Sequence, residues 1–264
     1  MEFYKTFKGD FDKFYQKFKN KENFSFCKFS DGELYILKNQ HLVLGPAAEH
    51  HSYQDSIDHK NFNPELHQFY RQKLFDALKY KSPNYYMGIC APSDYGDQDF
   101  YWFKQESGQD EEHLTWANLF VNSNYKLFVE KIIPEFSNYE IILVCNEKSD
   151  IKQAPFAKNI IRNYRVGSNC IINDYHLVET LKEYITEFKV KNKLFIFCCS
   201  SLGNYLCKAL NELEPENIYF DAGSTLNPYL GLSTDRGYLQ AALGNLWRGQ
   251  DTSADLDKEE TWKI

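Results

Sequence analysis

Two carboxylates separated by a single glycine are the residues of this sequence best suited to chemistry. Asp31 and Glu33 flank Gly32 where an alternating run at 24–29 gives way to the apolar run at 34–37, a pattern that predicts a strand followed by a helix. Residues two apart on a regular helix point to nearly opposite sides, because each position rotates by about 100°. The pair could therefore share one ion only if the backbone bends between the two, and Gly32 permits such a bend.

The same stretch also fits a capping box. Ser30 would be the N-cap, and the Glu33 side chain would reach back to the Ser30 amide. Acidic residues in a first helical turn are favoured by the helix dipole without any chemistry. The local pattern alone favours this structural interpretation, so an ion site at Asp31 and Glu33 depends on the rest of the chain.

Composition limits the classes of protein that the chain can belong to. Its 264 residues suit one large domain over 1–264, and its formal net charge of −7 argues against a general nucleic-acid binder. A phosphate ligand would need local help from lysine, a helix N-terminus or a metal. The seven cysteines, an odd number mostly within apolar runs, favour reduced thiols in a cytoplasmic protein. No signal peptide and no apolar run near membrane-spanning length are visible, which gives the same expectation.

Apolar runs and helical periodicities alternate along the chain. Strands are predicted at 24–29, 85–90, 139–145, 170–172, 193–199 and 218–220, and helices at about 64–79, 110–133, 151–162, 174–188 and 204–213. This alternation predicts an α/β, Rossmann-like fold with a mainly parallel sheet flanked by helices. In such sheets ligands bind beyond the carboxyl ends of the strands.

Polar residues follow several of these strands and are the candidate site residues. Those after the strands are Asp97 in the 91–99 loop, Asn146 and Glu147, Ser201, Gly203 and Asn204, and Asp221, Gly223 and Ser224; Asn118 and Asn122 form a polar wall near a helix break. The 200–204 turn could bind phosphate with free helix amides, or could be an ordinary N-capped crossover. The 91–99 loop could hold an acceptor sugar or could be a plain surface loop.

The two ends of the chain have distinct patterns. Residues of about 2–19 form an amphipathic helix with an aromatic stripe, which could contact a membrane surface that carries a lipid-linked acceptor or could pack on the domain. The pattern favours packing. From about 248 the sequence is acidic and polar, and we expect a mobile tail there.

Four stretches together resemble a known family. The opening KFSDGE, followed by a helix, resembles the acidic D-x-E element of the GT-D type glycosyltransferases, and TWANLFVNSNY at 115–125, IILVCNE at 141–147 and NIYFDAGSTLNPYLGL at 217–232 strengthen the resemblance. It covers most of the chain, from about 24 to 236. Lys28 and Ser30 stand where we expect Arg and Gly.

The resemblance implies a single glycosyltransferase-like domain that moves a sugar from a nucleotide-sugar donor to a glycan or glycolipid hydroxyl. A UDP-sugar is the first candidate for the donor. Mn²⁺ or Mg²⁺ would be held by Asp31 and Glu33. The donor would contact Lys28, Asn118, Asn122, Asn146, Ser201, Gly203, Asn204, Gly223 and Ser224, and the candidates for the base are Asp221, Glu147 and Asp97, with His113 a weaker fourth. The alternative functions are those of a methyltransferase and of a non-catalytic nucleotide- or glycan-binding module.

Overall fold

The structure is a computed structural model of the whole chain. It describes residues 4–45, 48, 59–90, 97–121, 124–233, 239 and 261–263, and for 4–7, 97 and 261–263 it describes the backbone alone. The candidate Asn122 and most of the stretch from 248 lie outside the described residues, as does the side chain of Asp97.

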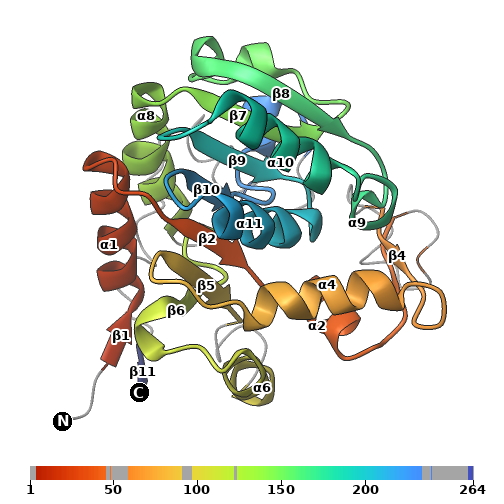
Figure 1. Cartoon of the computed structure of the whole chain (residues 1–264). Coiled ribbons are helices and arrows are strands. Elements are labelled where there is room, and N and C mark those ends of the chain that lie inside the picture. The colour runs from red at the N-terminus through yellow and green to blue at the C-terminus, as the bar shows by residue number, and fades with distance from the viewer. Residues whose placement is uncertain are drawn as a thin grey trace.

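A seven-stranded sheet forms the centre of the molecule (Figure 1). Every pairing between neighbouring strands is parallel, as the sequence predicted. Across the sheet the strands are Leu114–Trp116 (β6), Tyr85–Ile89 (β5), Ser25–Lys28 (β2), Ile218–Asp221 (β10), Leu194–Cys198 (β9), Ile141–Asn146 (β7) and Ile160–Val166 (β8). The carboxyl ends of β2, β10 and β9 are therefore neighbours at one edge.

One face of the sheet is covered by α11 (Leu202–Leu213), with α4 (Gln68–Lys79) and α10 (Leu177–Phe188) beside it (Figure 1). Leucines repeat along α11 every four residues, and Leu202, Leu206 and Leu210 are fully buried. This spacing places them on one side of the helix, so their burial holds α11 on the central strands.

The other face carries α1 (Phe7–Lys19). Phe11, Phe14 and Phe18 of its aromatic stripe are at most 1% exposed, and the rings of Phe14 and Phe18 contact residues of the central strands. The packing interpretation of the stripe is confirmed for these three rings. The helix begins at Phe7, not near residue 2, because Tyr4–Thr6 forms a strand, β1.

The elements from 125 to 138 lie on the same face. They are α7 (Tyr125–Leu127), a π-helical turn at Phe128–Ile132, α8 (Ile133–Glu135) and a 3₁₀ turn at Phe136–Asn138. Phe128 and Phe136 stack or pack edge-on against Phe220 of β10. Aromatic contacts thus bind the segment to the sheet.

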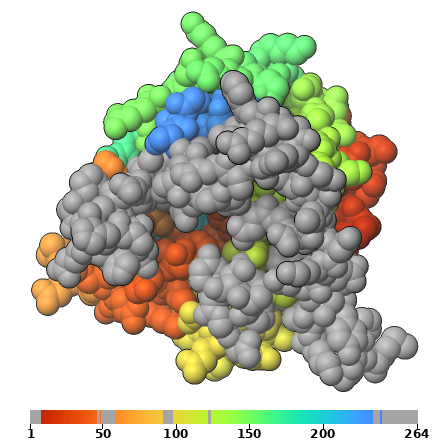
Figure 2. Space-filling view, turned by 180° about the vertical axis from the view of Figure 1, so that it is seen from behind, coloured from red at the N-terminus to blue at the C-terminus, as the bar shows by residue number. Residues whose placement is uncertain are grey.

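The remaining elements lie near the edges of the sheet. The short helices are α2 (Asp31–Leu37), α6 (Asp97–Ser107) and α9 (Cys170–Asn173), and further 3₁₀ turns span Glu111–His113, Ile151–Gln153, Ala157–Asn159 and Asn227–Leu230; β3 (Leu42–Val43) pairs antiparallel with β4 (Asn61–Phe62). In Figure 2, the reverse view, the surfaces of α2 (orange-red) and of the residues just after β10 (blue) reach the same side of the molecule.

Three predicted elements were wrong. The 110–133 helix contains β6, the 151–162 helix ends in strand β8, and the predicted 170–172 strand is the helical turn α9. Short apolar runs do not separate strand from helix by periodicity. The strand β8 is at the sheet edge with several exposed residues, so its hydrophobic pattern is weak.

Two further segments also differ from the prediction. Residues from Asp97 of the 91–99 loop onward begin α6, so the carboxylates at 97 and 99 belong to a helix. Thr261–Lys263 forms a strand, β11, that pairs with β1, so this part of the predicted tail is paired. Within the described residues no helix is both long enough and apolar enough to cross a membrane.

Candidate functional site

The exit of β2 is held by side chains from β10 and α11. The Asp221 carboxylate accepts hydrogen bonds from the backbone amides of Lys28 (3.2 Å) and Gly223 (3.1 Å). The Asn204 side-chain amide donates to the Lys28 carbonyl over 2.7 Å. Because β2 and β10 are parallel neighbours, these bonds form where both strands end. Lys28, Asn204, Asp221 and Gly223, four of the candidates, are thus brought together.

The Asp221 side chain is buried, with 4% exposure. Burial raises the pKa of Asp221 from 3.8 to about 6, against the opposing charge of Lys28 and with a further increase from Glu33. A carboxyl group with this pKa can release and accept a proton near neutral pH. Its role as a base stays a prediction.

A small cavity borders the same carboxylate. Phe26, Phe120 and Phe220 contribute rings to its wall, and the other lining residues are Lys28, Ala117, Val121, Asp221, Ala222 and Thr225. Asp221 therefore contacts both the buried junction and a partly polar hollow on the α1 side of the sheet.

The turn before α11 is packed against Asp221. The Leu202 amide donates to the Cys199 carbonyl and the Gly203 amide to the Ser200 carbonyl, at 3.2 and 2.9 Å. A Cβ at Gly203 would stand 3.4 Å from the Asp221 carboxyl carbon. Both amides already donate hydrogen bonds within the turn, and Gly203 packs against Asp221, so these groups do not form the anion site that the sequence suggested. Ser201 and Asn204 are also buried.

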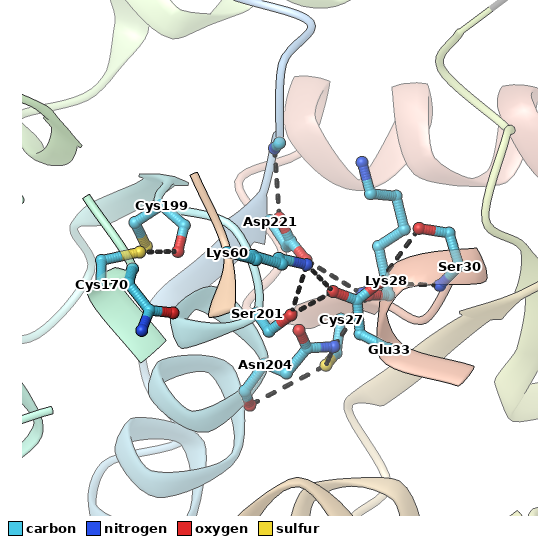
Figure 3. A network of polar contacts seen from close by, with 12 residues as sticks. Cys27, Lys28, Ser30, Glu33, Lys60, Cys170, Cys199, Ser201, Asn204 and Asp221 are labelled. Carbon is cyan, nitrogen blue, oxygen red and sulfur yellow. Dashed lines mark hydrogen bonds and ion pairs between the residues drawn. The ribbon is translucent and has the colours of Figure 1, made fainter. Parts of the chain in front are cut away.

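The Glu33 carboxylate is the centre of a second buried network (Figure 3). The Lys60 ammonium lies 3.0 Å from Glu33 Oε1 and 2.8 Å from the Ser201 hydroxyl, and that hydroxyl also donates to Oε1. The other oxygen, Oε2, accepts from the amide and the hydroxyl of Ser30, both at 3.0 Å. The predicted capping box is present, and it shares its glutamate with an ion pair.

This network fixes the ionised form of Glu33. Burial alone would raise its pKa, but the charge of Lys60, with hydrogen bonds from Ser201, Lys60 and the Ser30 amide, lowers it from 4.5 to about 2. The side chains of Lys60 and Glu33 are 5% and 7% exposed. Glu33 is thus ionised near neutral pH and paired with Lys60.

Asp31 and Lys28 are the more accessible charges of the acidic element. Both are partly exposed, and neither side chain forms a hydrogen bond or ion pair with a residue that the structure describes. The Lys28 side chain extends away from Glu33 in Figure 3, and its ammonium packs against Gly223 where a Cβ would stand. Position 223 favours glycine both because a Cβ there would meet the Lys28 ammonium and because its φ of +54° is strained for other residues.

The donor set does not fit a divalent ion shared by Asp31 and Glu33. A carboxylate offers about four lone-pair sites, and both oxygens of Glu33 already accept two bonds each. Across the described part of the chain, no group of three His, Cys, Asp or Glu side chains is arranged to hold a metal. Asp31 is the member of the pair whose oxygens could still serve one.

The other predicted site residues lie farther along the sheet edge. Asn146 and the exposed Glu147 follow β7, which is separated from β10 by β9. Glu147 faces Gly167, while the Asn146 side chain accepts from the Lys148 amide. Asn118 follows β6 at the far side of β5, and Ser224 follows Gly223 in the turn after β10.

Lys60 is the residue that sequence reasoning missed. Its stretch contains three histidines and several acidic residues, which favoured a solvated loop. Its partners Glu33 and Ser201 are distant in sequence, and no local pattern joins them. A buried lysine is rare unless it is paired, but its burial is visible only after folding.

No family model and no curated protein matches this chain. Two solved structures do, each with a TM-score of 0.54 and each covering 89% of this chain and 80% of the other. One, 14% identical, is described as the highly conserved domain of unknown function 1792, with a distinct glycosyltransferase fold. The other, 13% identical, is a selenomethionine-substituted structure of the same domain, DUF1792.

The chain has this glycosyltransferase-like fold. The resemblance stated from the sequence is confirmed at the level of the fold, since identities of 13% and 14% carry no more than that. The α/β class is confirmed as well.

Proposed function

We propose that this protein is a glycosyltransferase that moves a sugar from a nucleotide-sugar donor, with a UDP-sugar as first candidate, to a hydroxyl of a carbohydrate or lipid-linked acceptor. The observation that carries the proposal is the junction of Lys28 and Asp221 at the carboxyl ends of β2 and β10, in a glycosyltransferase-like fold. Ligands of open α/β sheets bind at such an edge.

The reaction requires two kinds of group. The bond between the sugar C1 and the donor phosphate oxygen breaks, a bond from C1 to the acceptor oxygen forms, and the acceptor proton leaves to a base. The Lys28 ammonium, unpaired among the described residues, would stabilise the charge that develops on the departing diphosphate. Asp221, with its pKa of about 6, would take the proton, either directly or through a water in the adjoining cavity.

Mn²⁺ or Mg²⁺ would fit this proposal only through Asp31. A hard divalent ion near Asp31 would supply charge to the diphosphate oxygens. The chain's own contribution is the lysine at the end of β2, which holds its position because the strand exit is fixed by Asp221 and Asn204.

The test is turnover of UDP-sugars by the full chain, with Lys28→Met and Asp221→Asn as variants. We expect release of UDP by the wild type, weaker donor affinity in Lys28→Met, and a lower transfer rate with retained donor affinity in Asp221→Asn. Lys19→Met, an exposed lysine at the end of α1, is the matched control for Lys28 and should change neither quantity. No turnover with any nucleotide sugar, but retained UDP binding, would favour a non-catalytic nucleotide-binding module.

A further inference from the structure

The acidic element carries its own cation. The Lys60 ammonium lies between the Glu33 carboxylate (3.0 Å) and the Ser201 hydroxyl (2.8 Å), which join α2 to the start of α11 (Figure 3). Carboxylate and hydroxyl oxygens are the donors that a hard divalent ion would use. The ammonium therefore occupies the position at Glu33 where such an ion would bind.

Gly32 has a second role that supports this assignment. A Cβ at Gly32 would lie 2.9 Å from the Lys60 ammonium, closer than side-chain contacts allow. The glycine between the two carboxylates therefore leaves space for the Lys60 ammonium in the position where it contacts Glu33.

The ion pair also sets the charge that a donor would meet. A diphosphate approaching Glu33 without Lys60 would be repelled by a carboxylate in a poorly screened, buried position. With Lys60 in place the pair carries no net charge. The Glu33 carboxylate is therefore neutralised without a divalent ion.

We propose that Lys60 takes the place of a divalent ion at Glu33, so that this protein binds an anionic nucleotide donor without metal at that carboxylate. The proposal rests on the proposed function for the identity of the donor. Glu33 is then a positioning residue that fixes Lys60 and joins α2 to α11, and it is not a metal ligand.

The first experiment is a titration of the nucleotide-free protein with Mn²⁺, in which the electron paramagnetic resonance signal of free Mn²⁺ measures how much ion is bound. We expect wild type and Glu33→Gln to have the same Mn²⁺ affinity within twofold, and Lys60→Met, which frees the carboxylate, to bind at least tenfold more tightly. A tenfold weaker affinity in Glu33→Gln would place the metal on Glu33 and overturn the proposal. If either single variant fails to fold by circular dichroism, the double variant Glu33→Gln/Lys60→Met replaces it, because it removes both charges of the pair. Its Mn²⁺ affinity should match that of wild type. A tenfold weaker Mn²⁺ affinity would again overturn the proposal.

The second experiment is calorimetric titration with UDP, in EDTA and in Mn²⁺. Wild-type affinities should agree within twofold, Lys60→Met should bind at least tenfold more weakly in EDTA, and Lys19→Met should match wild type. A tenfold loss of affinity in EDTA that Asp31→Asn shows as well would place a required metal away from Asp31 and overturn the proposal. If wild type binds no UDP in either buffer, the proposed donor class fails, while the Mn²⁺ titration still decides the role of Lys60.

Discussion

The ion pair between Glu33 and Lys60 makes the stability of the protein depend on acid pH in a defined direction. The Glu33 pKa is about 2 in the folded protein and 4.5 as its ordinary value. The folded state therefore binds this proton less tightly than the unfolded state does. The stabilisation is fully present above about pH 4.5 and is lost as the pH falls towards 2.

The size of the effect follows from the same pKa values. A drop in the Glu33 pKa from 4.5 to about 2 corresponds to about 3 kcal/mol of folding free energy. Glu33→Gln keeps the shape of the side chain but removes the carboxylate that pairs with the buried Lys60 ammonium, and removing one partner of a buried ion pair costs about 3–5 kcal/mol. We therefore expect the variant to be less stable than wild type by about 3 kcal/mol at pH 7.

The assay is urea unfolding of wild type, Glu33→Gln and Asp31→Asn from pH 7 down to pH 3. The gap in unfolding free energy between wild type and Glu33→Gln should shrink as the pH falls below about 4.5. Asp31→Asn is the matched control, because it makes the same chemical change two residues away at a partly exposed carboxylate, and it should stay within about 0.5 kcal/mol of wild type. Parallel pH profiles for wild type and Glu33→Gln would refute the reasoning.

Two further predictions concern the junction at β10. Because the pKa of Asp221 is raised from 3.8 to about 6, the folded state holds this proton more tightly than the unfolded state, and wild type should lose stability as the pH rises through that interval. Asp221→Asn should lack that loss in urea unfolding, and its sugar-transfer rate should fall by about 100-fold or more if the group is the base; an unchanged rate would exclude that role. Gly203→Val should destabilise the fold by about 1–3 kcal/mol, because its side chain would press on Asp221. Calorimetry should then find unchanged UDP affinity in the folded fraction, and a weaker affinity would return the 200–204 turn to the donor site.

Local patterns were sufficient for much of the fold. The continuous apolar runs at β7 and β9 predicted buried parallel strands, because strands covered on both faces need apolar residues at every position. Edge strands carry no such signal, which explains why β6 and the first residues of β8 were assigned to helices. β6 has three residues, and β8 leaves several side chains exposed.

The site was predicted in part for the same reason. Sequence reasoning could place Lys28, Asp221 and the 200–204 turn at strand ends, since strand ends follow from apolar runs. It could not say which of these groups would be exposed. Asp221 and Gly203 are buried because α11 packs directly on β10, a contact between segments that no local pattern joins.

The sequence by itself determined the α/β class, the aromatic face of α1 and the capping box at Ser30 and Glu33, since each depends on residues within a few positions of one another. Only the tertiary structure decided what Glu33 is for. The lysine that pairs with it comes from the residue before β4, and the hydroxyl from the turn before α11. A buried charge requires a partner, but the folded chain alone determines which residue supplies it.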